Sequence, residues 1–378
     1  MLYKKAKTAA LVLVGLFAMI SSSQSPGQTP VKSPLSKWRS RDYPGIGFAG
    51  SSKCAECHGD LATAQRATPM ASALEVPGSS QILGSRLPLT FRNGPYSYKI
   101  AREGNRILYT VSDGTSAISE PIMFCFGRGV AGQTYVFQHG GGYYESRVSY
   151  YQELQNLDIT ILHPRGVPGS LEEALGRPMS GEAVRGCFDC HSTAAQAGLD
   201  LNPGKVVPGV TCERCHGPGE KHIAAVKAGN LKDLSIFNPG TLDAFDQMQE
   251  FCGACHQGFE TVMLMPDQGG INNIRFQPYR MFKSQAHFIN DSRISCVACH
   301  DPHGKLERDP AFYDSKCLAC HLSSREEAKT STRNASACPV SKQQCVTCHM
   351  PKVDLPEMHF KFTDHWIRIA KPGTQVPR

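Results

Sequence analysis

Alternating apolar and polar residues between positions 87 and 161 predict a β-rich segment. Five runs follow the period-2 pattern of strands that bury one face; they cover residues 96–100, 107–111, 122–126, 133–137 and 143–151. Turn-forming residues separate the runs, namely Gly104-Asn105, Asp113-Gly114 and Gly140-Gly141-Gly142. We interpret the segment as an antiparallel meander within residues 81–165.

The rest of the chain shows little regular periodicity. Short helical patterns occur at residues 170–175 and 325–329, and long amphipathic helices are scarce. The expected fold class is therefore α+β with low regular structure, in which one β subdomain is inserted into a chain of short helices and irregular segments.

The first 23 residues have the three parts of a secretory signal peptide. Lys4, Lys5 and Lys7 precede a run of 12 mostly apolar residues from Ala9 to Ile20, which is followed by serines. A membrane-spanning helix needs about 20 apolar residues. We therefore predict an exported protein, periplasmic or extracellular, without a transmembrane span in the mature chain.

Composition and charge narrow the function further. The 378 residues carry a formal net charge of +7, which falls to +4 without the three N-terminal lysines. This composition excludes a coiled coil, a collagen-like fibre and a multi-span membrane protein. No Lys/Arg block of the kind that follows phosphates is present, so nucleic acid is not an expected partner.

Fourteen of the 16 cysteines belong to one repeated pentapeptide, Cys-x-x-Cys-His. The cysteines of its seven copies are Cys54 and Cys57, Cys187 and Cys190, Cys212 and Cys215, Cys252 and Cys255, Cys296 and Cys299, Cys317 and Cys320, and Cys345 and Cys348. The histidines that complete them are His58, His191, His216, His256, His300, His321 and His349. We number these motifs first to seventh along the chain.

This spacing is that of covalent c-type haem attachment. Cysteines at i and i+3 share one face of a helical turn, where their thiols reach the two vinyl groups of a porphyrin. The histidine at i+4 then lies beneath the iron as its proximal ligand. The sequence therefore predicts seven haem c groups.

Three other uses of paired cysteines fit less well. Structural zinc takes such pairs two at a time, and a disulfide framework has no need of a constant three-residue step. Thioredoxin-like motifs occur singly beside a βαβ pattern. Export also favours haem, because c-type attachment takes place outside the cytoplasm.

Six of the motifs lie within 163 residues, from Cys187 to His349, which leaves about 27 residues for each haem. So little protein cannot surround each porphyrin with an ordinary core, so we expect short helices that wrap stacked haems. The predicted organisation is a signal peptide at 1–23, a first-haem segment at 24–80, the β insert at 81–165 and a six-haem domain at 166–378.

The ligand on the other, distal side of each iron decides between a six-coordinate electron carrier and an open reactive site. Seven histidines lie outside the motifs, enough for a second imidazole at each iron. One of them, His139, adjoins the Gly140–Gly142 turn. The candidate distal ligands are His163, His222, His287, His303, His359, His365 and Met70.

Spacing restricts two of these candidates. His303 follows His300 by one turn and stays on the proximal side of that haem, so it should serve a neighbouring haem; His222 is in a similar position after His216. Met70 competes for the first haem, where a thioether would raise the potential, or it is a core methionine.

Two cysteines, Cys125 and Cys338, lie outside the motifs. They either form one disulfide in the exported protein or remain buried thiols.

Several segments resemble the cytochrome c554-type multihaem cytochromes. They are Gly209–His222, Arg293–Gly304, Cys345–Pro351 and the closing His359–His365. The resemblance extends from Cys187 to His365 and more loosely to the Cys54 region. It implies a bacterial exported electron-transfer protein with closely stacked haem pairs. Relatives often carry a histidine near the position of Met70, and the β insert has no assignment from this family.

The leading hypothesis is electron transfer between redox protein partners through closely spaced haems, with a membrane-associated complex as one setting. With two propionates on each haem, the ferric protein would carry about −3 and the reduced one about −10. The alternatives are a multihaem oxidoreductase that acts on a small nitrogen or sulfur compound at a five-coordinate haem, and a haem-lined filament or conduit subunit. All seven motifs end in His, so the Lys variant typical of ammonia-forming nitrite reductases is absent.

Overall fold

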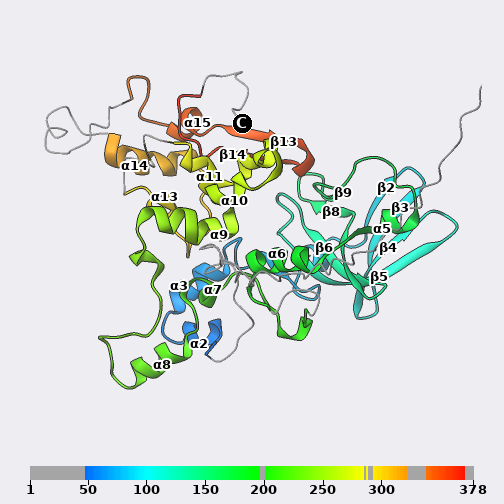
Figure 1. Ribbon diagram of the computed structural model, residues 1–378, viewed down its shortest axis with the longest axis horizontal. Coiled ribbons are helices and arrows are strands. Elements are labelled where there is room, and N and C mark those ends of the chain that lie inside the picture. Colours follow the sequence, from blue (N-terminus) through cyan, green and yellow to red (C-terminus); the bar gives the residue numbers. More distant parts are fainter. Residues whose placement is uncertain (1–46, 196–200, 285–286, 288–292, 322–337, 371–378) are drawn as a thin grey trace, which may run out of the picture. The chain divides into compact units, whose positions relative to one another are not determined.

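The computed structural model describes residues 47–195, 201–284, 287, 293–321 and 338–370 (Figure 1). By its internal contacts the chain divides into Met1–Ser33 and Pro34–Arg378, and all the described residues belong to the second unit. The predicted signal peptide and the predicted helix at residues 325–329 lie outside the described residues.

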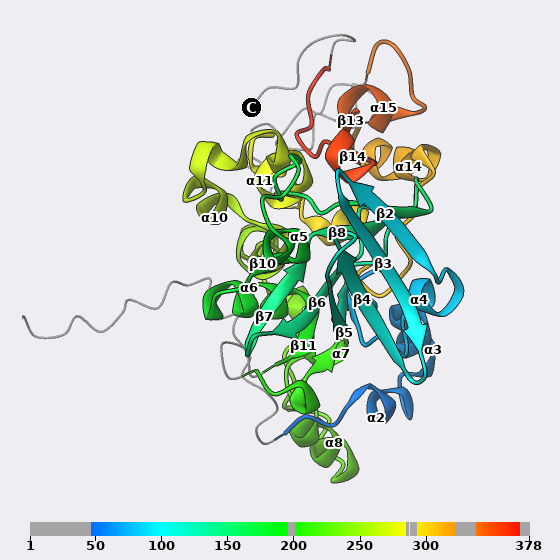
Figure 2. The ribbon, with the colours of Figure 1, turned by 90° about the vertical axis from the view of Figure 1, so that its right-hand side faces the viewer.

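An antiparallel sheet of eight strands forms the β subdomain (Figure 2). Strands β2 to β7 follow one another as neighbours in sequence order, which confirms the predicted meander. Their bounds are β2 Leu89–Asn93, β3 Tyr96–Glu103, β4 Arg106–Ser112, β5 Ala117–Phe126, β6 Thr134–His139 and β7 Gly142–Ser146.

The sheet forms because alternate residues bury one face. Tyr96, Tyr98 and Ile100 of β3 are buried, and the residues between them are not. The turn between β6 and β7 consists of Gly140 and Gly141, both with positive φ (56° and 82°). A two-residue hairpin needs this left-handed conformation, which glycine adopts without a steric penalty.

Short strands from outside the predicted insert also join the sheet. β1 (Leu74–Glu75) pairs with β5, and β10 (Gly176–Pro178) pairs with β7. The run predicted at 143–151 divides into β7 and β8 (Val148–Tyr151), and β8 forms a hairpin with β9 (Asn156–Ile159). The period-2 pattern does not identify two- or three-residue strands, because they are too short to show alternation.

The helix that carries the second motif packs on this sheet. Helix α6 (Gly181–His191) places Phe188 edge-on against Phe124 and Phe126, with ring centroids 5.0 and 5.2 Å apart. These residues belong to an apolar cluster distinct from the main sheet core. The second motif is thus anchored to the β subdomain by aromatic packing.

The remaining helices are short, as predicted; α14, with 12 residues, is the longest in the described part. Helix α5 (Leu171–Leu175) confirms the helix predicted at 170–175, and Ser170 caps it by accepting a hydrogen bond from the Glu173 amide (3.1 Å). The other α-helices are α2 Ser51–Ala55, α3 Gly59–Arg66, α4 Gln81–Ser85, α7 Cys212–His216, α8 Glu220–Lys227, α9 Gly253–His256, α10 Phe259–Met263, α11 Gln277–Phe282, α13 Cys296–Cys299, α14 Pro310–His321 and α15 Cys345–His349.

Other helical turns and small two-stranded sheets complete the unit. The tighter or wider helical segments are η1 Pro203–Lys205, η2 Pro239–Thr241, the π-helix η3 Asp246–Cys252, η4 Pro266–Arg275 and η6 Pro356–Met358. The remaining strands are β11 Ser192–Ala194, β12 Val207–Pro208, β13 Lys352–Leu355 and β14 Phe360–Thr363, paired as β11–β12 and β13–β14. None of the helices described is long and apolar enough to cross a membrane.

Candidate haem-attachment sites

Each motif lies on or directly beside a short helix. Helices α2, α6, α7, α13, α14 and α15 carry the first, second, third, fifth, sixth and seventh motifs. The fourth differs, because Cys252 ends the π-helix η3 and Cys255 lies in α9. Helical backbone at the motifs provides the i, i+3 placement that attachment through two thiols requires.

The cysteines do not form disulfides. All 16 lie in the described residues, and none is bonded to another. The structure therefore contains neither a disulfide framework nor a Cys125–Cys338 bridge. Cys125 is a fully buried thiol in β5, whereas Cys338 is half-buried. The described residues also hold no cluster of three or more His, Cys, Asp or Glu side chains arranged for a metal ion.

Four motif histidines each face a histidine from another part of the chain. The centroid distances are 6.4 Å for His58–His222, 6.0 Å for His216–His303, 6.0 Å for His287–His321 and 6.2 Å for His300–His365. A metal ion bound at about 2.0–2.1 Å by the nearest nitrogen of each of two imidazoles leaves their centroids roughly 6.3 Å apart. The four spacings therefore fit an iron between each pair.

Backbone carbonyls orient five of the candidate ligands. A carbonyl oxygen only accepts hydrogen bonds, so each of these rings carries its proton on Nδ1 and leaves the Nε2 lone pair for a metal. The contacts are His191 to Ala73 (2.9 Å), His216 to Phe237 (3.0 Å), His222 to Leu234 (2.8 Å), His349 to Arg368 (3.0 Å) and His365 to Thr363 (3.0 Å).

Burial keeps several of these imidazoles neutral. It lowers the pKa of His365 to about 4, and it also lowers the pKa values of His191 and His300. A neutral imidazole has the free nitrogen lone pair that a metal ligand needs. The residues present therefore fit haem iron in both spacing and protonation.

The three other histidines outside the motifs hold carboxylates instead. His163 and His359, both named from the sequence as distal candidates, use Nε2 to contact Glu145 (3.0 Å) and Asp158 (2.8 Å). His139 contacts Glu120 through Nδ1 (2.8 Å) and Glu172 through Nε2 (3.2 Å). Their Nε2 atoms are thus already engaged within the protein.

The position of His139 predicts a pH dependence of stability. The hydrogen bond to Glu120 is the main cause that raises the pKa of His139, and Glu172 adds to it. A raised pKa in the folded state means that this stabilisation is complete below the unfolded value, about 6.5, and is lost as the pH rises through the folded value. Urea midpoints should therefore fall from pH 6 to pH 8 more steeply in the wild type than in His139→Gln. Parallel curves would contradict this assignment.

Three motif histidines have no second imidazole in ring contact within the described residues. They are His191, His256 and His349. Met70, the sequence candidate for the first haem, is half-buried, and its carbonyl accepts hydrogen bonds from the Ala73 and Val210 amides. The same Ala73 holds the ring of His191, so the Met70 segment adjoins the second motif.

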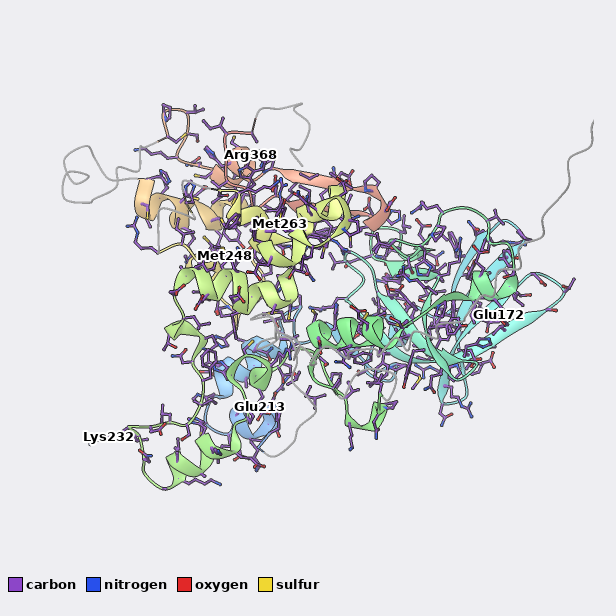
Figure 3. All side chains as sticks on the ribbon, in the orientation of Figure 1. Glu172, Glu213, Lys232, Met248, Met263 and Arg368 are labelled. Carbon is purple, nitrogen blue, oxygen red and sulfur yellow. The ribbon has the colours of Figure 1, made fainter. Side chains whose placement is uncertain are left out.

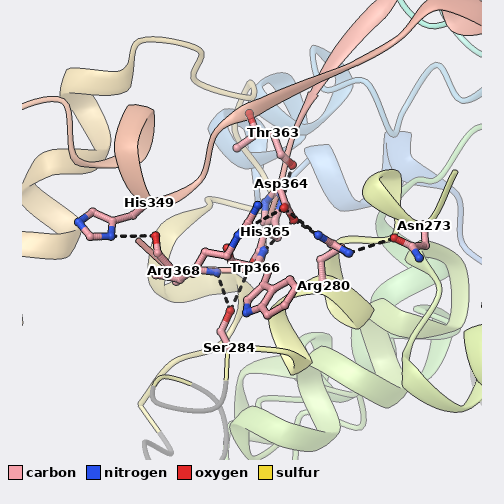
Figure 4. A network of polar contacts seen from close by, with 10 residues as sticks. Asn273, Arg280, Ser284, His349, Thr363, Asp364, His365, Trp366 and Arg368 are labelled. Atoms are coloured by element: carbon pink, nitrogen blue, oxygen red, sulfur yellow. Dashed lines mark hydrogen bonds and ion pairs between the residues drawn. The ribbon is translucent and has the colours of Figure 1, made fainter. Parts of the chain in front are cut away.

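A buried ion-pair network supports two candidate ligands at once (Figure 4). Arg280 and Asp364, both fully buried, form two hydrogen bonds of 2.8 Å, and Arg368 contacts the same carboxylate at 2.6 Å. His365 follows Asp364 directly, and the carbonyl of Arg368 holds the ring of His349. Asp364 therefore fixes a segment that positions both histidines.

Sequence reasoning did not identify Arg280, Asp364, Glu213 or Asp314, whose buried carboxylates and guanidinium groups support the motifs. The only signal in the sequence was a charged residue inside or shortly before a motif, as Glu213 lies between Cys212 and Cys215. Charged residues are common at exposed positions, so this signal does not distinguish a buried support from a surface residue.

Comparisons with known proteins agree with the motifs and the fold. The family model for cytochrome c554 and c-prime matches residues 171–217, which include the second and third motifs. The multiheme cytochrome MtrA of Shewanella baltica (strain OS185) is 24% identical over 178 residues, 44% of this chain. The match spans 45% of that curated relative, less than half of its length.

A solved structure shares the fold. The outer cell wall cytochrome OcwA aligns with a TM-score of 0.50 and 15% identity, over 85% of this chain and 79% of that one. The seven attachment motifs and the paired histidines, together with these likenesses, support a multihaem c-type cytochrome family. Its similarity to the c554-type family is located in the helices of the second and third motifs.

Proposed function

We propose that this protein is an exported electron-transfer cytochrome that carries seven haem c groups. The proposal rests on four motif histidines. Each faces a second imidazole, and the ring centroids of the four pairs are 6.0–6.4 Å apart. Two imidazoles leave no coordination position for a substrate, which suits electron transfer rather than catalysis at those sites. Each haem iron, when bound, supplies a one-electron redox couple.

The chain's own residues would hold these groups as follows. The two cysteines of each motif provide the thioethers, and the motif histidine provides the proximal ligand. His222, His303, His365 and His287 provide the distal ligands opposite His58, His216, His300 and His321. Every one of these pairs joins two different segments, so ligation would also tie neighbouring segments together.

The three motifs without a second imidazole support a second candidate function. At His191, His256 or His349 an open position would permit reduction of a small nitrogen or sulfur compound. The observation that favours this is the use of His139, His163 and His359 by carboxylates, which leaves too few histidines for the remaining motifs. Met70 is then the remaining candidate for a distal ligand near the second motif.

Two observations support export. They are the signal-peptide pattern at the N-terminus and the descriptions of the similar proteins. One solved relative is an outer cell wall cytochrome, and the curated one is a multiheme cytochrome. We propose a location outside the cytoplasm, where redox proteins donate and accept the electrons. The filament or conduit hypothesis remains a prediction.

The test is the haem content and spin state of the secreted holoprotein. The mass of the intact chain should exceed that of the processed polypeptide by seven haem groups. Electron paramagnetic resonance of the oxidised protein should show low-spin signals for at least the four paired sites. A mass without haem, or spectra dominated by high-spin iron, would overturn the electron-carrier assignment. Additional high-spin signals that nitrite or hydroxylamine abolishes would support the second candidate.

A further inference from the structure

The first motif is held by a carboxylate from the third. Glu213 of α7, labelled in Figure 3, is 3% exposed and accepts hydrogen bonds from the amides of Ala49 (2.7 Å) and Gly50 (2.9 Å), just before α2. The thiols of Cys54 and Cys212 also contact each other, and α2 packs against α7. The first and third motifs are therefore direct neighbours.

The seventh motif is held in the same way by the sixth. Asp314 of α14 is buried and accepts hydrogen bonds from the amides of Gln344 and Cys345, both at 2.8 Å. The thiols of Cys317 and Cys345 contact each other, and α14 packs against α15. The first and seventh motifs are thus held in the same way. A buried carboxylate from the helix of the neighbouring motif, the third or the sixth, accepts hydrogen bonds from the backbone at the start of each.

The motifs between these pairs are also in contact. Cys252 of the fourth motif contacts Cys296 of the fifth and lies near Cys215 of the third. The fifth and sixth motifs meet where the Tyr313 hydroxyl of α14 approaches Nδ1 of His300 (3.4 Å). The order in space is therefore third, fourth, fifth and sixth.

The second motif lies beside the third and fourth motifs, outside this series. The Arg214 guanidinium, inside the third motif, donates a hydrogen bond to the Asp189 carbonyl of the second. The Cys190 thiol contacts the carbonyl of Ala254 (3.8 Å), and α6 packs against α9. Because α6 also packs on the sheet through Phe188, the second motif connects the fourth motif with the β subdomain.

Exposure distinguishes the two ends of the series from its interior. Of the fourteen motif cysteines, all described, only Cys57 of the first motif and Cys348 of the seventh are exposed. The other twelve are half-buried. The motifs that come first and last in the contact series are thus the ones that reach the surface.

We propose that the motifs form a single row in the order first, third, fourth, fifth, sixth and seventh, with the second as a side branch beside the third and fourth. Electrons then enter and leave at the first and seventh motifs. This inference rests on the proposed electron-transfer function. The electron-exchange surfaces are then those around Cys57 and Cys348. Each has an exposed lysine nearby, Lys352 at the seventh motif and, at the first, Lys53, which forms an ion pair with Glu56 (2.7 Å). Reversing either charge makes its surface more negative and so less accessible to anionic reactants.

The test uses the reduced holoprotein and hexacyanoferrate(III), an anionic one-electron oxidant. The double variant Lys53→Glu/Lys352→Glu should slow oxidation about tenfold at low ionic strength, because reversed charge repels the anion at both exchange surfaces. Each single variant should slow it less, since the other surface still reacts. The matched control, Lys99→Glu/Lys205→Glu, changes exposed lysines on β3 and η1 and should oxidise at the wild-type rate.

A second readout requires no electron transfer. The redox-inactive anion hexacyanochromate(III) should broaden proton signals of haem methyl groups in the wild type and the control, and broaden them much less in the Lys53→Glu/Lys352→Glu variant. An unchanged oxidation rate in that variant, or an equal loss in the control, would overturn the inference while haem content stays complete. A preparation without haem would instead overturn the proposed function itself.

Discussion

Asp364→Asn should lower the free energy of unfolding by about 3–5 kcal/mol, the usual cost of breaking a buried ion pair. The substitution leaves the Arg280 guanidinium without its counter-charge at a site where both side chains are fully buried. Asparagine still offers one acceptor oxygen, but it cannot receive both hydrogen bonds from Arg280 and the contact from Arg368.

The large effect follows from how much the carboxylate holds. Besides the two arginines, it accepts a hydrogen bond from the Trp366 amide (3.0 Å), and the Trp366 ring lies 5.3 Å from the Arg280 guanidinium and 5.0 Å from that of Arg368. Because this segment positions His365 and His349, its loss should change both haem environments and not only the stability.

Thermal unfolding of the holoprotein measures the loss of stability, and a redox titration measures the change in the two haem environments. The matched control is Asp60→Asn, an exposed carboxylate in the first turn of α3, for which the stability should change by no more than about 0.5 kcal/mol. Arg280→Gln should reproduce the instability from the other side of the pair. Equal melting temperatures for Asp364→Asn and Asp60→Asn would show that the ion pair is not structural.

His303→Ala should convert one haem from low spin to high spin. His303 faces His216 at 6.0 Å and is the proposed distal ligand at the third motif. Alanine removes the imidazole and leaves a five-coordinate iron that also binds small ligands. The potential of that haem should move away from the bis-histidine value, because the axial ligand is a main determinant of it.

Electron paramagnetic resonance and the binding of cyanide or carbon monoxide measure this change. The matched control is His359→Ala, because the sequence also suggests His359 as a ligand while the structure uses its Nε2 for Asp158. That variant should keep the wild-type spin state. A high-spin signal in His359→Ala, or its absence in His303→Ala, would contradict the ligand assignment.

The sequence predicts the meander because its strands obey a local rule. Tyr98 and Tyr109 fall on the buried face by alternation alone, and Gly140 and Gly141 mark a turn that only a left-handed backbone can make. The attachment motifs are equally local, since a pentapeptide fixes two cysteines and a histidine within one helical turn. The sequence therefore predicts all seven motifs and the strands β3 to β8, but not β1, β2, β9 or β10.

The distal ligands of the haem irons are set by contacts between residues far apart in the chain, and the sequence does not show these contacts. Nothing in the sequence distinguishes His163 and His359 from His365 as candidate ligands. Only the fold shows that Glu145 lies beside His163 and Asp158 beside His359. The same limit applies to Arg280 and Asp364, which are 84 positions apart. The sequence could suggest that His303 serves a neighbour, but it could not identify His216 as the histidine opposite.

The contact between His359 and Asp158 has a consequence for how the protein matures. It connects the β13–β14 hairpin to the β8–β9 hairpin across 201 positions and adds a ring contact with Tyr151 (4.8 Å). Closing so long a loop costs chain entropy that only a preformed docking site repays. We therefore expect the sheet to form before the C-terminal hairpin docks on it. All motifs from the second to the seventh lie between these two hairpins, so the contact closes a loop that contains six of the seven attachment motifs.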